Sequence, residues 1–262
     1  SKKLATTMAI VENMYVDNVD DMKLAEDVVK SLLKELDPHS TYISSDEVKE
    51  MNEPLEGNFD GIGISFNMMT DTLYVIEALA GGPSEKIGIR AGDKILYVND
   101  TLIAGVKRSN KYVMSQLKGP KGTKVNVKVL RKGVSELLDF RITRDKIPVY
   151  SIDASYMVDT NTGYIHIVRF GATTTKEFRE ALAKLKELGM ENLILDLRGN
   201  GGGYMGPAID LSDEFLDKGK LIVYTEGTHQ PRRDEISTAK GGFEKGKLVI
   251  LIDVGSASAS EI

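Results

Sequence analysis

The stretch LILDLRGNGGGYM, from Leu193 to Met205, decides how the second half of the chain is interpreted. Its apolar residues predict a buried strand, and the Arg-Gly-Asn that follows, with a run of glycines, predicts a turn before a helix. Backbone amides in such a turn can hold a phosphate, but the lysine and Ser/Thr of a phosphate-binding loop are missing, and the glycine spacing does not fit dinucleotide binding. Another use of bare amides is to stabilise an oxyanion.

Strands and helices alternate on both sides of this stretch. Strands are predicted at residues 163–170, 191–198, 221–226 and 247–253, and helices at residues 174–189 and 206–217. This alternation predicts an α/β layer whose strands are largely parallel.

The last predicted strand runs directly into DVGSASASEI, from Asp253 to Ile262. One interpretation is a turn of small residues followed by a helix. The other is a nucleophilic serine placed where the strand becomes a helix. The residues of this segment alone leave both interpretations open.

Residues 58–145 have a different character, with short alternating strands, turns rich in Gly, Asn and Asp, and two short helices. The sequences DGIGISF and GPSEKIGIRAGDKILYVND resemble a PDZ domain. Resemblance implies that Gly61, Ile62, Gly63 and Ile64 bind the C-terminus of a peptide, with converging amides around its carboxylate and the peptide added as a strand. A plain glycine-rich turn is the alternative, whereas a dinucleotide fingerprint is excluded because its third glycine would fall on Phe66.

Residues 1–57 are predicted to be a helical region. Apolar residues recur at helical spacing in two segments, and the segment DPHSTY (Asp37 to Tyr42) ends the second helix, because Pro38 disfavours a helical residue before it. The apolar stripes predict burial, either against the rest of the chain or against a second subunit. We take residues 146–262 as the third region, the α/β core, with residues 145–150 as its entry linker.

Composition excludes several classes of function. The net charge of −5 gives no electrostatic reason to expect nucleic acid as a partner. The chain has no cysteine and only three widely separated histidines (His39, His166 and His229), so neither disulfides nor a metal-ligand spacing is present, and we predict no metal or cofactor. No apolar run is long enough to cross a bilayer, and no signal peptide is visible.

Four motifs occur in the order found in the carboxyl-terminal processing proteases, also called tail-specific proteases. They are LDPHSTY, the PDZ-like segment, LDLRGNGGG and GSASASE, and together they span nearly the whole chain. Gly201 stands where this family usually has Pro or Ser. The resemblance implies a multidomain α/β plus β-rich fold, with an N-terminal helical segment, a PDZ-like domain and an α/β protease core of the crotonase/ClpP type.

The same resemblance implies the site residues. Ser258 matches the nucleophile, and the backbone N–H groups of Ala259 and Gly203 are expected to form the oxyanion hole. Ser256 and Ser260 are better interpreted as residues that begin a helix. A Ser-His-Asp triad with His39 or His166 is less well supported than the lysine base that the family uses, with a helper glutamine. That lysine belongs beyond residue 262, so we expect the core to be incomplete and the chain as written to be inactive.

The predicted function is therefore a serine endopeptidase that recognises protein C-termini through its PDZ domain and cleaves with a Ser/Lys dyad. We predict an exported protein, periplasmic or attached to the envelope, which the absence of cysteine fits, and a homo-oligomer formed through the N-terminal helices. A noncatalytic PDZ adaptor, or an inactive protease homologue, is the alternative. A crotonase-like enzyme acting on acyl thioesters shares the paired amides but does not account for the PDZ-like segment.

Overall fold

The structure is a computed structural model that describes residues 2–38, 40–239 and 241–262. The chain divides into two compact units, Ser1–Met51 and Asn52–Ile262, which are described separately. In the described part, no helix is both long and apolar enough to span a membrane. His39, which the sequence placed at a helix end, lies outside the described residues.

The first unit is helical, as predicted. It contains α1 (Lys2–Met14), α2 (Asp21–Lys34) and most of α3 (Ser45–Asn52). Asp20 caps α2 by accepting a hydrogen bond from the Lys23 N–H at 3.1 Å. No residue of α1 or α2 is buried within the described structure, and Met14 and Leu32 remain 78% and 60% exposed. The burial that their apolar stripes predict is therefore not met within this unit, and the oligomer stays a prediction.

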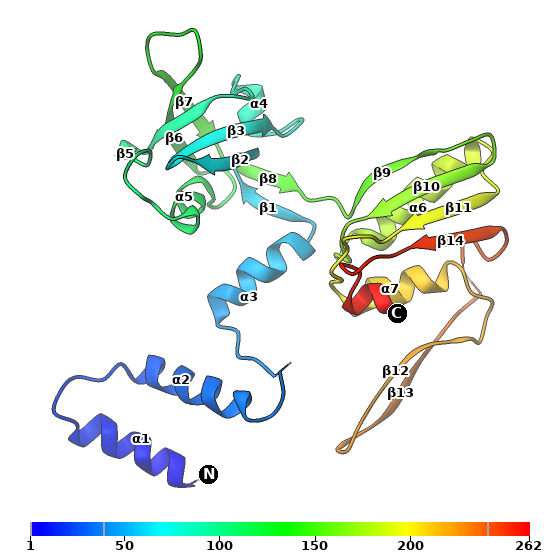
Figure 1. The fold of residues 1–262 in the computed structure, drawn as a ribbon, viewed down its shortest axis with the longest axis horizontal. Coiled ribbons are helices and arrows are strands. Elements are labelled where there is room, and N and C mark those ends of the chain that lie inside the picture. The colour runs from blue at the N-terminus through cyan, green and yellow to red at the C-terminus, as the bar shows by residue number, and fades with distance from the viewer. Residues whose placement is uncertain (1, 39, 240) are drawn as a thin grey trace. The chain divides into compact units, whose positions relative to one another are not determined.

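The second unit begins with the PDZ-like domain (Figure 1). Its six-stranded sheet has the order β2-β3-β4-β6-β7, with β5 paired to β4. The strands are β2 (Ile64–Met69), β3 (Thr72–Ala78), β4 (Lys94–Val98), β5 (Thr101–Leu102), β6 (Lys124–Leu130) and β7 (Leu138–Thr143), and the helices are α4 (Pro83–Lys86) and α5 (Asn110–Leu117). Alternate residues of β6 point into a core of their own, including Val125, Val127 and Val129.

The expected linker at residues 145–150 is largely a strand. Here β8 (Asp145–Pro148) pairs antiparallel with β1 (Asn58–Gly61), which follows the 3₁₀ helix η1 (Glu53–Leu55). The chain thus leaves the PDZ-like domain beside the point where it enters (Figure 1). The linker interpretation was wrong for these residues because Pro148 stands at the strand end, where its missing N–H does not prevent pairing.

The α/β layer is a four-stranded sheet of order β14-β11-β10-β9. Strands β10 (Thr162–Ile167), β11 (Asn192–Asp196) and β14 (Lys247–Leu251) are parallel, as predicted, while β9 (Ile152–Met157) pairs antiparallel with β10. The helices are α6 (Thr174–Glu187) and α7 (Met205–Asp213). Phe178, Leu182 and Leu185 of α6 are buried against the apolar residues of the sheet.

One predicted strand of the layer lies elsewhere. The segment at residues 221–226 forms β12 (Leu221–Gly227), which pairs only with β13 (Gln230–Ile236) in the described structure. The two form an antiparallel hairpin separate from the four-stranded sheet (Figure 1). The expectation that this strand joins the α/β layer is therefore wrong, because a partner that our sequence analysis did not identify as a strand takes up its hydrogen bonds.

Candidate active site

The glycine turn after β11 and the serine segment after β14 meet in space. Parallel neighbouring strands end at the same edge of a sheet, so the residues that follow β11 and β14 lie together. Asn200, which is fully buried, joins them through its carbonyl oxygen. That oxygen accepts hydrogen bonds from the Ala257 N–H at 3.1 Å and the Ser260 hydroxyl at 2.9 Å.

The side chain of Asn200 also fixes the glycine turn. Its amide donates to the Ile167 carbonyl at the end of β10, and its Oδ1 accepts from the Gly202 N–H, both at 2.9 Å. A buried amide whose donors and acceptor are matched in this way sets one geometry for the loop, because an unmatched group would be costly. In the sequence, Asn200 stands out only as part of the motif LDLRGNGGG, and no local spacing indicates this role.

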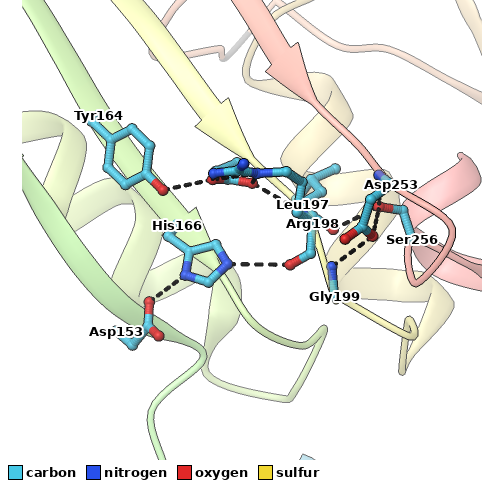
Figure 2. A network of polar contacts seen from close by, with 9 residues as sticks. Asp153, Tyr164, His166, Leu197, Arg198, Gly199, Asp253 and Ser256 are labelled. Carbon is cyan, nitrogen blue, oxygen red and sulfur yellow. Dashed lines mark hydrogen bonds and ion pairs between the residues drawn. The ribbon is translucent and has the colours of Figure 1, made fainter.

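Asp253 and Ser256 form a second link between the two turns (Figure 2). One carboxylate oxygen of Asp253 accepts from the Gly199 N–H at 2.9 Å and the Gly255 N–H at 2.8 Å. These backbone donors lower the pKa of the Asp253 carboxyl. The Ser256 hydroxyl donates to the Leu197 carbonyl at 2.8 Å, so Ser256 has a structural part in the turn rather than beginning a helix.

Ser258 has a left-handed backbone, with a φ of 56°. A serine in this conformation is strained, and such strain is typical of residues that a fold holds in place for function. The residue is exposed, and its hydroxyl makes no hydrogen bond within the described structure. Its N–H donates to the Glu261 carboxylate at 2.7 Å, at the start of the 3₁₀ helix η2 (Ser258–Glu261).

The structure distinguishes the glycines of the turn. A Cβ atom on Gly202 would lie 2.9 Å from the Ser258 Cβ, 2.9 Å from the Ala259 nitrogen and 2.8 Å from the Ala257 oxygen, so Gly202 is in direct contact with the serine segment. Gly203, which our sequence analysis chose, pairs with Phe170 instead.

The Gly203 amide nevertheless faces away from Phe170. The Gly202 carbonyl of the same peptide bond accepts from the Phe170 N–H at 2.9 Å, and in a trans peptide the N–H points opposite to the carbonyl. The Gly203 N–H thus points away from Phe170, and Gly202 is the glycine that contacts the serine segment.

A buried carboxylate supports the end of β11. Asp196 accepts from the Arg198 guanidinium at 2.6 Å and from the Tyr164 hydroxyl at 2.6 Å. The hydrogen bonds from Arg198 hold the pKa of Asp196 well below its usual range, although burial opposes this. Burial and the hydrogen bond to Asp196 raise the pKa of Tyr164.

His166 lies in the same network rather than against Ser258. Its Nδ1 is 2.7 Å from the Asp153 carboxylate, and its Nε2 is 3.3 Å from the Arg198 carbonyl (Figure 2). Both ring nitrogens thus have structural partners, and the geometry offers no Ser258–His166 hydrogen bond. In the described part of the chain, no group of three or more His, Asp or Glu side chains is arranged to hold a metal ion.

The predicted peptide-binding loop lines a cavity of about 350 Å³. Gly61, Ile62, Gly63 and Ile64 line it together with the α5 residues Met114 and Leu117. The remaining lining residues are Phe59, Phe66 and Lys118 of the PDZ-like domain, with Glu53, Pro54, Val149 and Arg169 from outside it. The structure therefore places the four predicted loop residues at one apolar groove.

Arg144 supports the wall of that groove. Its guanidinium donates to the Leu117 carbonyl at 2.9 Å and the Gln116 carbonyl at 2.8 Å, at the C-terminal end of α5. Burial lowers its pKa.

Two protein-family models match parts of the chain. Residues 161–262 match Peptidase family S41, and residues 61–142 match the PDZ domain family. The chain is 36% identical to carboxy-terminal processing protease CtpA of Bacillus subtilis, over 99% of this chain and 55% of that protein. It is 34% identical to a carboxy-terminal-processing protease of Bartonella bacilliformis, over 96% of this chain and 58% of that protein.

A solved PDZ domain of a carboxy-terminal protease from Vibrio cholerae, in complex with peptide, is 32% identical. The match covers 34% of this chain and 97% of that one, with a TM-score of 0.31. The chain spans a little over half the length of the two curated relatives.

A PDZ domain at residues 61–142 followed by an α/β core of peptidase family S41 at residues 161–262 defines the class of this chain. Over 96–99% of its length the chain is similar to carboxy-terminal processing proteases, at 34–36% identity.

Proposed function

We propose that the protein carrying this chain is a serine endopeptidase. It binds protein C-termini in its PDZ groove and attacks the substrate chain with Ser258. The observation that carries this proposal is the contact between Gly202 and the serine segment, with Ser258 exposed on a left-handed backbone. A left-handed backbone at a residue other than glycine is a form of local strain that occurs often at functional sites, which supports a functional part for Ser258.

The turn supplies amides for the transition state. When the serine oxygen attacks a carbonyl, negative charge develops on the substrate oxygen, and fixed N–H donors stabilise it. We propose the N–H groups of Ala259 and Gly203 for this role. The supporting geometry is the closeness of the Ala259 nitrogen to Gly202 and the direction of the Gly203 peptide.

The proposed base is a lysine, made basic at neutral pH by burial that disfavours its charged form. The family resemblance places it after residue 262, so this part of the proposal depends on residues outside the given sequence. The partners bonded to both nitrogens of His166 support a base other than that histidine. The PDZ groove would raise the concentration of a bound tail at the serine.

Ser258→Ala in the full-length protein tests the proposal. We expect cleavage of a protein with an apolar C-terminal tail to fall by about 10³-fold or more, because the nucleophile is lost. Binding of the tail peptide, measured by fluorescence anisotropy, should be unchanged. Ser135→Ala, at an exposed serine of the PDZ-like domain, is the matched control and should leave both measurements unchanged.

The two measurements separate the proposed enzyme from an adaptor. Undiminished cleavage by Ser258→Ala would remove Ser258 from the mechanism. Tail binding by a full-length protein that never cleaves would favour the noncatalytic PDZ adaptor, and cleavage without tail binding would remove the PDZ part of the proposal.

A further inference from the structure

Arg169 is a residue of the α/β region that lines the PDZ groove. It lies two residues after the end of β10, yet it lines the cavity formed with the loop at Gly61–Ile64 and α5. Its Nε is buried and has no hydrogen-bond partner among the residues that the structure describes. Burying a guanidinium N–H without an acceptor is unfavourable, so this position favours a ligand that brings one.

The backbone around Arg169 fixes its approach to the groove. Phe170 is buried, and the next residues contact the segment that leads into the PDZ-like domain. The Ala172 N–H donates to the Leu55 carbonyl at 2.7 Å, and Gly57 packs closely on the Thr173 side chain. These contacts hold Arg169 beside η1, whose residues Glu53 and Pro54 also line the cavity.

The other charged residues that line the cavity leave the Arg169 guanidinium available to bind an anion. Glu53 is paired with Lys118, so these two lining charges satisfy each other. Most other lining residues are apolar or glycine. The segment FDGIGISF, which contains the predicted carboxylate loop, has no lysine or arginine and has an acidic residue, Asp60, directly before Gly61. An anion bound at this loop would therefore need a cation from another part of the chain.

We infer that the Arg169 guanidinium binds the free α-carboxylate of a protein tail held in the PDZ groove. The amides of the Gly61–Ile64 loop and the guanidinium would share the two carboxylate oxygens, a charge-assisted contact that discriminates a true C-terminus from an internal segment. Arg169 thereby determines specificity for chain ends. This inference rests on the proposed function, because it presupposes that the groove accepts tails.

The test compares one apolar-tailed peptide in two forms, with a free C-terminal carboxylate and with a C-terminal amide, on the full-length protein. We expect the unmodified protein to bind the free acid at least about tenfold more tightly than the amide. Arg169→Met should weaken free-acid binding by about tenfold or more and leave amide binding nearly unchanged. Arg169→Lys should restore part of the preference, since a lysine keeps the charge but loses the paired donors.

Arg90→Met is the control, because Arg90 is an exposed arginine of the PDZ-like domain that does not line the cavity. It should keep the full preference for the free acid. Amide binding within Arg169→Met shows whether the groove still folds, and loss of both peptides together with a lowered Tm would assign Arg169 a structural role.

The outcomes separate this inference from the proposed function. If the unmodified protein binds the free acid and Arg169→Met keeps the same acid-to-amide ratio, tail binding stands and the role of Arg169 is wrong. Equal binding of acid and amide by the unmodified protein also overturns the inference alone. Binding of neither peptide overturns both.

Discussion

At the scale of single residues, the glycine turn shows which positions have no room for a side chain. Gly202 has a φ of 98°, and a Cβ there would meet three atoms of the serine segment at 2.8–2.9 Å. At Gly201, where the family usually has Pro or Ser, a Cβ would meet nothing within 4 Å and φ is not in the left-handed region. Position 201 therefore has room for the side chain that the family usually has there, and the fold does not require this chain's glycine.

Gly202→Ala should consequently displace the serine segment. We expect a loss of about 1–3 kcal/mol in the free energy of unfolding, because both strain and overlap are introduced, and a fall in peptidase activity of the full-length protein. Urea unfolding and a cleavage assay measure the two effects. Gly201→Ala is the matched control and should change neither. Equal effects of the two substitutions would show that the described contact with Ser258 is wrong.

Asp196 is a single residue that makes the free energy of unfolding depend on pH. Its pKa is lowered in the folded state by the hydrogen bonds from Arg198. Its stabilising contribution is thus complete above the unfolded pKa of about 4 and is lost as pH falls through the folded value. Asp196→Asn should therefore cost more stability at pH 7 than at pH 3.

Urea unfolding of the unmodified chain and of Asp196→Asn at pH 7, 5 and 3 measures this difference. Asp210→Asn, at an exposed carboxyl of α7, is the control and should change the free energy of unfolding only slightly at every pH. If the loss of unfolding free energy caused by Asp196→Asn stays constant from pH 7 to pH 3, the lowered pKa of Asp196 in the folded state is wrong.

At the scale of elements, strong local patterns were predictable from the sequence and pairings were not. The spacing of Phe178, Leu182 and Leu185 predicts α6, and their burial on one face confirms it. The meeting of the glycine and serine turns followed from the parallel order of the strands before them. Which glycine touches the serine was not predictable, because that depends on the direction of single peptide bonds.

Other elements show why sequence patterns were insufficient. Strand β13 is polar along most of its length (QPRRDEI), so no apolar alternation marks it, and it exists because it pairs with β12. Strand β8 begins at charged residues and contains Pro148, and its pairing with β1 joins residues far apart in sequence. Asn200 and Asp253 act through backbone groups of distant residues, which no local spacing reveals.

At the scale of the whole second unit, the apolar cores form two separate sets. The PDZ-like core and the α/β core share no buried residue. We expect calorimetry to resolve two unfolding transitions, because each core packs against its own sheet and can unfold separately.

Two substitutions should assign these transitions. Phe178→Ala, at a fully buried side chain, should destabilise the α/β transition by about 3–5 kcal/mol and leave the other in place. Val127→Ala should lower only the PDZ-like transition. A single transition that both substitutions shift equally would mean that the two cores unfold together.

The outer edge of the α/β sheet has a practical consequence for the polypeptide itself. One side of β14 pairs with β11, and among the described residues no strand occupies its other side. Val249 and Ile250 are half exposed there, and Ile252 just beyond the strand is 66% exposed. Unsatisfied amides beside apolar side chains form a template for sheet growth between molecules. Concentrated solutions of residues 1–262 should therefore aggregate and become turbid on storage. Val249→Lys is the simplest substitution to prevent this aggregation in crystallisation or NMR samples.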